Sequence, residues 1–356
     1  MTIVADVVDF SIGIDSHRDT HTAALIDAAN TAVIDDLTIA VDTGGYQQLF
    51  DWVAAHTGTG TPRVWAVEGC GSYAAGLTRF LLGLGEWVVE VERPARPSRQ
   101  TPAKDDLIDA VRAARETLGR DLTQAATPRQ GDTRDALAVL LAARHGAVQA
   151  AKAAANQLHA AITAAPEPLR ARFDTLKSTK AKLDLAESLR PSNYNNVAAA
   201  ATAQALKSIA RRHRVEQSEA VMLKERLTEL IQSWRPDLLN VQGVGPVVAA
   251  TVLCAWSHPG RCRSDAAFAS LAGTAPIPAS SGQTTGRMRL NHGGDRRLNT
   301  AIHTIALTRL RHDPDTRSYR ERRIAQGKTE REIRRCLKRY ITRQLHRQLK
   351  TPLDNT

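Results

Sequence analysis

The sequence has 356 residues and a net charge of +11, which gives a pI near 9.9. Basic residues concentrate near the end of the chain, where residues 311–350 hold eleven Arg and three Lys against five Asp or Glu. This asymmetry favours a polyanionic partner, above all nucleic acid, because Lys and Arg release counterions when they neutralise phosphates. The alternative is a soluble protein that is basic without such a partner.

The composition argues against secreted and membrane-spanning classes. No apolar run approaches the roughly 18 residues of a membrane span, and the start of the chain lacks a basic segment followed by an apolar one. The four cysteines form no Cys-x-x-Cys pair and have no His partners at metal spacing. We therefore expect reduced thiols and a cytoplasmic protein without a membrane partner.

Short alternating apolar segments dominate the first hundred residues and predict strands separated by helices. The strands are expected at residues 8–15, 21–26, 32–41, 63–68 and 87–91, and the helices at residues 44–55 and 73–82. This order is that of a ribonuclease-H-like domain, in which parallel strands extend a three-strand meander and helices cover the sheet. The predicted fold class is therefore α/β, followed by a mostly helical remainder.

Acidic residues stand at the ends of two of these strands. Asp15 ends the first strand and Glu68 ends the fourth, and the ends of these two strands lie side by side in such a sheet. A helix is expected to begin near Lys104, and its Asp106 and Asp109 share one face because they are three residues apart. Four carboxylates in one place repel one another unless they hold divalent cations, and oxygen atoms are the ligands that Mg²⁺ prefers.

Each of these acids also has an ordinary structural interpretation. Asp15 is compatible with a turn acid after a strand, Glu68 with a surface carboxylate, and Asp106 with Asp109 as a pair favoured by the helix macrodipole. Their joint placement favours the metal site. Composition does not decide whether Asp105 or Asp106 faces the metal; we assign Asp106, because Asp109 lies one turn further on, and expect Asp105 to face solvent.

Two long helices are expected in the middle of the chain. An alanine-rich segment with apolar residues in steps of four and three predicts a helix over residues 134–162, and a second helix with the same pattern ends at Pro236. The simplest arrangement is an antiparallel coiled coil. Small alanines allow close helix approach, which suits self-association and an intramolecular hairpin equally. The helices are joined by residues 165–200, in which Pro166, Pro168 and Pro191 indicate loops.

The final third combines a glycine turn, a hydroxyl-rich loop and basic helices. Residues 241–246 have the pattern of a helix-hairpin-helix turn, whose second helix presents N–H groups to a phosphate. Residues 279–287 contain Ser281, a hydroxyl nucleophile that could meet a phosphodiester there. The basic residues nearby are candidates for nucleic-acid binding: Arg287, Arg289, Arg296 and Arg297.

Seven short motifs follow one another along nearly the whole chain. They are Gly13-Ile14-Asp15, Glu68-Gly69, residues 104–110, Gly243-Val244-Gly245-Pro246, residues 272–276, Ser281-Gly282 and residues 294–298. Together they resemble the DEDD-type transposases of insertion sequences, which use a bridge RNA to pair donor and target DNA. The resemblance implies a RuvC-like catalytic domain over residues 1–130, a coiled-coil linker over residues 131–238, and a C-terminal transposase domain over residues 239–356.

The resemblance also implies a mechanism. Asp15, Glu68, Asp106 and Asp109 match the acids of the family that bind the metal, with Mg²⁺ as the expected cofactor, and Ser281 matches its serine nucleophile. A phosphoserine intermediate would allow strand exchange without external energy. The family further implies a bridge RNA that reads the DNA by base pairing, and a homo-oligomer, a dimer or a tetramer, whose protomers complete the site together.

Two residues depart from the family pattern. Asp295 stands where the family commonly has Asn, which adds a negative charge near DNA, and Ser280 duplicates the hydroxyl of Ser281. Neither change removes a required group. Two other functions stay open: a metal-dependent junction-resolving nuclease in which water attacks, and a non-catalytic DNA- or RNA-binding protein. A sugar-kinase-like use of the fold is disfavoured, because no second phosphate-binding glycine-rich loop follows.

Overall fold

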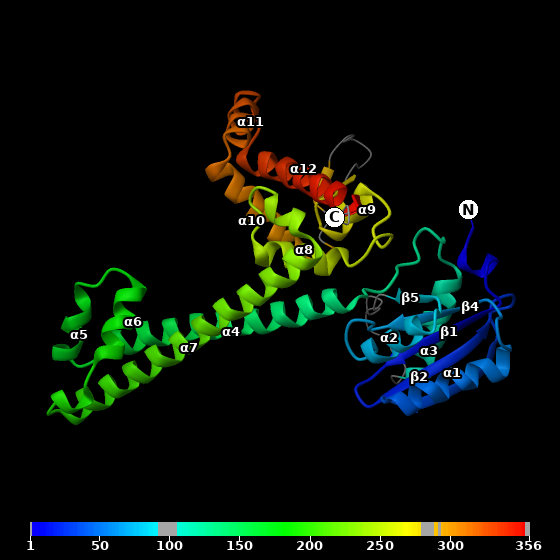
Figure 1. Cartoon of the computed structure of the whole chain (residues 1–356), viewed down its shortest axis with the longest axis horizontal. Helices are drawn as coiled ribbons and strands as arrows, with labels where there is room; N and C mark the ends of the chain where they lie inside the picture. Colours follow the sequence, from blue (N-terminus) through cyan, green and yellow to red (C-terminus); the bar gives the residue numbers. More distant parts are fainter. Residues whose placement is uncertain (1, 92–104, 279–287, 291–292, 353–356) are drawn as a thin grey trace. The chain divides into compact units, whose positions relative to one another are not determined.

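The chain contains two compact units (Figure 1). The first comprises the chain up to residue 130 together with residues 257–261, and the second comprises residues 131–256 and the chain from residue 262 onward. In the described part of the chain, no helix combines the length and the apolarity that crossing a membrane requires. The computed structural model describes residues 2–91, 105–278, 288–290 and 293–352.

A five-stranded mixed sheet forms the centre of the first unit. Its order is β3-β2-β1-β4-β5, so β1 lies in the middle and β3 and β5 lie at the edges. β1 pairs antiparallel with β2 and parallel with β4, β2 pairs antiparallel with β3, and β4 pairs parallel with β5. The predicted meander extended by parallel strands is therefore confirmed. The strands are β1 Phe10–Ser16, β2 Thr20–Asp27, β3 Val33–Ala40, β4 Arg63–Glu68 and β5 Val88–Val91.

Helices cover both faces of this sheet. Side chains alternate along β4, so Trp65 points to one face and Val64 to the other. On the first face, Trp65 shares a core with Leu49 of α1 and Leu77 of α2. On the opposite face, Val64 shares a core with Ala114 of α3. The first unit is therefore a three-layered α/β structure, as predicted. Its helical elements are η1 Val4–Asp6 (a 3-10 turn), α1 Thr43–Thr57, α2 Ala75–Gly83 and α3 Asp106–Leu118.

α3 packs against β1 unusually closely at Gly13. A Cβ atom at Gly13 would lie 1.9 Å from the backbone oxygen of Ala110 and 2.9 Å from the backbone nitrogen of Ala114. The buried hydroxyl of Ser11 also donates a hydrogen bond to the carbonyl oxygen of Ala114, at 3.2 Å. The missing side chain at Gly13 and this hydrogen bond together fix the position of α3 on the central strand.

Two long antiparallel helices begin the second unit. Leu137, near the start of α4, shares a core with Leu227, near the end of α7. Leu158, near the end of α4, shares another core with Leu206 in the first half of α7. The predicted antiparallel helix pair is therefore confirmed. The two helices are α4 Asp132–Thr163 and α7 Val197–Trp234.

The segment between these two helices is more helical than its prolines predict. Pro166 is the N-cap residue of α5, Pro168 lies in the first turn of α5, and Pro191 begins a 3-10 turn. Proline is compatible with the first turn of a helix, because the N–H groups there have no partner within the helix. The prediction of a loop is therefore confirmed at Pro166, which lies between α4 and α5, and is wrong at Pro168, which lies inside α5. The elements are α5 Glu167–Asp174, α6 Thr179–Ser188 and η2 Pro191–Asn193.

The rest of the second unit is mostly helical, as predicted. Its core contains Leu253 of α8, Phe268 of α9, Ile302 of α10 and Leu345 of α12. A two-stranded antiparallel sheet of β6 and β7 interrupts the helices. The elements are η3 Pro236–Asn240, α8 Pro246–Trp256, α9 Asp265–Leu271, β6 Pro276–Pro278, β7 Met288–Leu290, α10 Arg296–His312, α11 Pro314–Ala325 and α12 Glu330–Lys350.

The four cysteines all lie in the described part of the chain and are free thiols, as the sequence predicts. Cys70 is buried between β4 and α2 in the core of the first unit. Burial raises the pKa of the Cys70 thiol to about 12. The thiol is therefore protonated at neutral pH, and it serves as a small core side chain without nucleophilic character.

Replacing Gly13 with Ala is expected to destabilise the first unit, because the added carbon collides with helix backbone that cannot rotate away. We expect a loss of about 1–3 kcal/mol in the free energy of unfolding, measured by urea denaturation. Gly83→Ala is the matched control, since no heavy atom lies within 4 Å of a Cβ at that position in α2. This control should keep or raise the stability, by up to about 1 kcal/mol. Equal stability of the two variants would contradict the close approach of α3.

Candidate metal centre

Asp15 lies near the end of the central strand β1, and it is only 6% exposed. The strand is flanked by β2 on one side and β4 on the other. The parallel register pairs Ile14 with Val67, so the residues that follow, Asp15 and Glu68, are neighbours across the two strands. The prediction that the ends of the first and fourth strands lie side by side is therefore confirmed.

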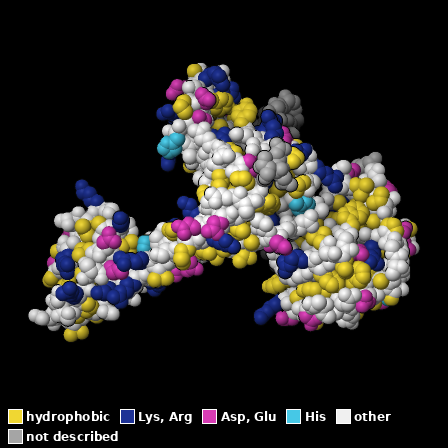
Figure 2. Space-filling view, in the orientation of Figure 1, with side chains coloured by type: hydrophobic (Ala, Val, Ile, Leu, Met, Phe, Trp, Pro, Cys, Tyr) yellow, Lys and Arg dark blue, Asp and Glu magenta, His cyan; other side chains and the backbone are white. Residues whose placement is uncertain are grey.

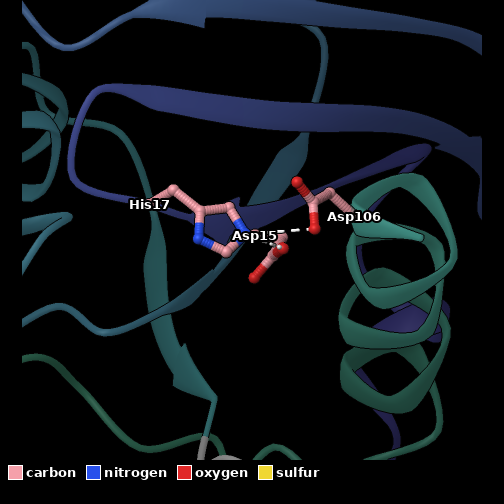
Figure 3. Close-up of side chains that lie close together, drawn as sticks. All are labelled: Asp15, His17 and Asp106. Carbon is pink, nitrogen blue, oxygen red and sulfur yellow. Dashed lines mark hydrogen bonds and ion pairs between the residues drawn. The ribbon is translucent and has the colours of Figure 1, made fainter. Parts of the chain in front are cut away.

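The first turn of α3 brings Asp106 to the same place. Asp105 is the N-cap residue of α3, and its side chain accepts a hydrogen bond from a backbone N–H of the first turn at 3.0 Å. Asp106 instead extends toward Asp15 (Figure 3). Gly13 packs closely against Ala110, which lies one turn after Asp106, and this contact holds Asp106 near Asp15. In the doublet of acids, Asp106 therefore faces the strand and Asp105 caps the helix.

A histidine completes the group (Figure 3). His17 Nε2 lies 3.1 Å from Asp15 Oδ2 and 3.1 Å from Asp106 Oδ1. This nitrogen and one carboxylate oxygen of each Asp all lie within 4.8 Å of one another. The turn after β1 holds the histidine backbone, because the His17 N–H donates to the carbonyl oxygen of Thr20 at 3.0 Å. Three metal-ligating side chains from two distant segments therefore converge.

His17 is missing from the residues that the sequence predicts for this site. A single histidine has no metal-type spacing to mark it, and its approach to Asp106 depends on the folded chain. The available signal is its position, two residues after the strand-terminal Asp15 and within the turn that follows. A side chain at that place leaves the sheet beside the carboxylate.

The electrostatics of Asp15 place all four predicted acids in one neighbourhood. Burial raises the pKa of the Asp15 carboxyl, the adjacent His17 lowers it, and the charges of Asp106, Glu68 and Asp109 raise it. The net result is a pKa above the usual value. Because each of these carboxylates is close enough to affect Asp15, a cation among them would relieve their mutual repulsion.

Glu68 and Asp109 lie outside the closest group of donors. The backbone oxygen of Glu68 accepts a hydrogen bond from the hydroxyl of Ser16 at 2.9 Å, which ties the ends of β1 and β4 together. The carboxylate of Asp109 pairs with the guanidinium of Arg112 at 2.7 Å. In the described part of the chain, the tight group consists of Asp15, His17 and Asp106.

The residues of this group fit a divalent metal ion. Carboxylate oxygens suit Mg²⁺, and an imidazole nitrogen suits transition metals. Adjacent ligands of a six-coordinate ion with bonds of about 2.1 Å stand about 3.0 Å apart. The two distances from His17 Nε2 to the carboxylate oxygens are 3.1 Å. Chemistry and spacing of the donors therefore agree with a metal centre.

The predicted serine and arginines are in the final third of the chain. Ser281 and Arg287 lie outside the described residues, and for Arg289 the structure describes only the backbone, in β7. Arg296 and Arg297 are exposed in the first turn of α10. Of this predicted set, the structure therefore gives side-chain surroundings only for Arg296 and Arg297.

Asp295, which departs from the family pattern, has a structural role. Its Oδ1 accepts hydrogen bonds from the backbone N–H groups of Arg297 and Leu298, at 2.9 and 3.0 Å, so it caps α10. Asp and Asn cap helices about equally well, and an acid at a helix N-terminus also interacts favourably with the macrodipole. The replacement of Asn by Asp therefore preserves the local structure.

Basic side chains of α10 and α12 approach one another. Lys338 Nζ donates to Asn299 Oδ1 at 2.6 Å, and Asn299 Nδ2 donates to the carbonyl oxygen of Ala272 at 2.7 Å. Burial lowers the pKa of Lys338. Burial and the charges of Lys338 and Arg334 lower the pKa of His303. Lys338 is therefore half-buried and fixed by Asn299, and His303 is held in its neutral form.

Lys and Arg side chains also cover other helices of the second unit. On the face drawn in Figure 2, dark blue side chains are spread over this unit, the end formed by α5 and α6 included. Some of them pair with acids, as Arg226 does with Glu229 at 2.6 Å on α7. The positive charge that the sequence shows is therefore distributed over several helices.

Fold and site together define a class of protein: an α/β unit with a carboxylate centre beside its central strand, joined to a mostly helical and basic unit. Residues 12–165 match the IS110-type DEDD transposase family, and residues 236–321 match the Transposase IS116/IS110/IS902 family. The chain belongs to this family of insertion-element transposases. The resemblance noted from the sequence is thereby confirmed.

Two curated proteins are similar to part of this chain. One is an uncharacterised 42 kDa protein of insertion element IS900 from Mycobacterium paratuberculosis, 34% identical over 92 residues. The other is an uncharacterised 43.6 kDa protein of insertion element IS110 from Streptomyces coelicolor, 35% identical over 94 residues. Each match covers 26% of this chain and 23% of the relative. The matched segment therefore covers less than a quarter of the length of each relative.

We expect Asp106→Asn to weaken Mg²⁺ binding about tenfold or more, because it removes a charged oxygen ligand from the centre. Isothermal titration calorimetry of the full chain measures the effect. The matched control is Asp105→Asn, which retains a capping side chain because Asn caps helices as well as Asp does. The control should bind Mg²⁺ like the wild type. A loss of affinity confined to Asp105→Asn would show that the ligand had been assigned to the wrong acid.

Proposed function

We propose that this protein is a DNA transposase that cleaves and rejoins strands by phosphoryl transfer. The observation that carries the proposal is the convergence of Asp15, His17 and Asp106 beside a central strand, in a chain of a transposase family. The strand order β3-β2-β1-β4-β5, with helices on both faces, supports an RNase-H-like and RuvC-like assignment for this unit. The first unit is then the catalytic domain.

Asp15, Glu68, Asp106 and Asp109 are the proposed holders of the catalytic metal, and Mg²⁺ is the proposed ion. When bound at such a site, the ion neutralises charge on the scissile phosphate and on the attacking and leaving oxygens. The chain supplies the position of the ligands. Asp15 is fixed within the sheet and Asp106 within the first turn of a packed helix, and rigid elements hold reacting groups more accurately than loops do.

Ser281 is the proposed nucleophile. Its Oγ gives up a proton and forms a bond to the phosphorus of the scissile phosphodiester. The bond between that phosphorus and the leaving oxygen breaks, and this oxygen takes up a proton to become a free hydroxyl. The phosphoserine linkage retains the energy of the broken bond, so the strand can be joined to a new partner. Support comes from the family's serine motif and from the place of Ser281 in the sequence, a few residues before Arg287 and Arg289.

The proposed partners are donor DNA, target DNA and a bridge RNA. Arg287, Arg289, Arg296 and Arg297 are assigned to phosphate contacts, a role that the exposure of Arg296 and Arg297 supports. Such contacts position a nucleic acid without reading its sequence. Sequence choice is assigned to base pairing with the RNA, in line with the family that the sequence resembles.

A homo-oligomer, a dimer or a tetramer, is the proposed working form. The antiparallel pair α4 and α7 supports a coiled-coil linker over residues 131–238, between the catalytic domain and the C-terminal domain. The acids and Ser281 are assigned to different domains. A linker of this kind allows the acids of one protomer to act with the serine of another.

The experiment that tests the proposed function is detection of a covalent protein–DNA adduct on a denaturing gel. The full chain is incubated with Mg²⁺, DNA from the ends of the element and RNA transcribed from its flanking non-coding region. We expect an adduct with the wild type and none with Ser281→Ala, because only an attacking hydroxyl leaves the strand attached to the protein.

Ser280→Ala is the matched control, since it removes the neighbouring hydroxyl and leaves Ser281 in place. This variant should form the adduct. Strand cleavage by wild type and Ser281→Ala without any adduct would overturn the serine mechanism in favour of a nuclease that uses water. DNA binding that ignores Mg²⁺, is unchanged by Asp106→Ala and is accompanied by no cleavage would identify a non-catalytic binding protein.

A second prediction concerns the salt dependence of DNA binding. If Arg296 and Arg297 each contact a phosphate, their joint replacement by Ala should reduce the slope of log K against log salt by about 1.8, or about 0.9 per contact. Fluorescence anisotropy with duplex DNA at several salt concentrations measures the slope. The control is Arg226→Ala, because this arginine already pairs with Glu229 on α7. An unchanged slope in the double variant would exclude the two arginines from the phosphate contacts.

A further inference from the structure

We propose that His17 is a nitrogen ligand of the metal ion held by Asp15 and Asp106, and that this ligand makes the centre prefer Mn²⁺ to Mg²⁺. The inference rests on the proposed metal-dependent function and deepens it, because it concerns the identity of the ion. The four acids of the family resemblance form an all-oxygen set, and His17 adds a different kind of donor to it.

The direction of the imidazole ring is the first observation. A single ring atom, Nε2, lies at the same distance of 3.1 Å from an oxygen of Asp15 and an oxygen of Asp106 (Figure 3). A hydrogen atom on Nε2 can point well at only one of two oxygens, because hydrogen bonds weaken steeply away from linearity. The ring nitrogen is within hydrogen-bonding distance of Asp15, and all three donor atoms lie within 4.8 Å of one another, so an ion that replaces the proton between them could contact all three.

Burial of the three side chains is the second observation. The side chain of Asp15 is 8% exposed, whereas those of His17 and Asp106 are 34% and 40% exposed. Asp15 therefore forms the closed side of the group, and the other two side chains border on solvent. Such a site leaves positions open for water or a phosphate oxygen, as a catalytic metal requires.

The fixed backbone around His17 is the third observation. His17 follows β1 directly, and its N–H donates to the carbonyl oxygen of Thr20 within the turn to β2. The ring is thus carried by the same strand and turn as Asp15. Ligands fixed in this way lose little entropy when an ion binds.

The nitrogen ligand determines which ions the centre favours. Mg²⁺ binds oxygen ligands almost exclusively, whereas imidazole increases the affinity for divalent transition metals. Mn²⁺ accepts both oxygen and nitrogen ligands and has a size and coordination number near those of Mg²⁺. We therefore expect Mn²⁺ to bind more tightly than Mg²⁺, and we expect this preference to depend on His17.

Pulsed electron paramagnetic resonance of the full chain loaded with Mn²⁺ tests the proposal directly, without measuring catalysis. A coordinated imidazole couples its nitrogen nucleus to the Mn²⁺ electrons, and labelling the histidines with ¹⁵N changes the signal. We expect this coupling in the wild type and its loss in His17→Asn. In the same variant, the ratio of the Mg²⁺ and Mn²⁺ dissociation constants should fall about tenfold.

The matched control is His56→Asn. His56 Nε2 also lies beside a carboxylate, 3.2 Å from Asp35 Oδ2, but it is outside the group of three donors. This variant should keep the nitrogen coupling and the metal preference. Thermal unfolding of both variants without metal shows whether each is folded.

The outcomes separate the inference from the proposed function. Mn²⁺ bound with no nitrogen coupling, or coupling that persists in His17→Asn, would overturn His17 as a ligand while leaving a carboxylate metal centre in place. Failure of the wild type to bind Mn²⁺ or Mg²⁺ would overturn both the inference and the metal-dependent function. Coupling lost only in His17→Asn, with Mn²⁺ still bound through Asp15 and Asp106, is the result we expect.

Discussion

The contact between α3 and β1 at Gly13 is the constraint on which the candidate site depends. Ala110 of α3 is close enough to the strand that no side chain fits at Gly13. Asp15 lies two residues beyond Gly13 on the strand, and Asp106 lies one turn before Ala110 on the helix. A helix lifted from the sheet by even one methyl group would carry Asp106 away from Asp15. The convergence of the candidate metal ligands is therefore a consequence of close backbone packing.

Much of the first unit could be predicted from the sequence, because its strands alternate and its acids stand at strand ends. The strands β1 and β4 follow from this pattern, and the adjacency of Asp15 and Glu68 follows from their parallel pairing. His17 could not be predicted in this way. Its partner Asp106 is distant in sequence, and only tertiary packing brings the two together.

In the second unit, periodicity revealed the long helices, but the prediction of a loop was wrong at Pro168. Pro168 was compatible with a helix because it occupies a first turn, where the chain needs no N–H donor.

For the segment that contains Ser281, the sequence predicts a chemical role but no position. Its chemistry is suggested by a serine followed by glycine near basic residues, a pattern that indicates a role for the hydroxyl without indicating where the hydroxyl lies in space. Its assignment as nucleophile therefore depends on the family resemblance.

The edges of the central sheet bear on how copies of this protein can associate. An edge strand offers unpaired backbone groups to any other strand and invites aggregation. β3, at one edge, carries the adjacent acids Asp35 and Asp36, so pairing with the same strand of another copy would bring like charges together. At the other edge, the N–H of Glu90 in β5 already donates to the carbonyl oxygen of Ala126 at 2.8 Å. The acids of β3 and the hydrogen bond of β5 therefore both disfavour association of two copies through the edges of this sheet.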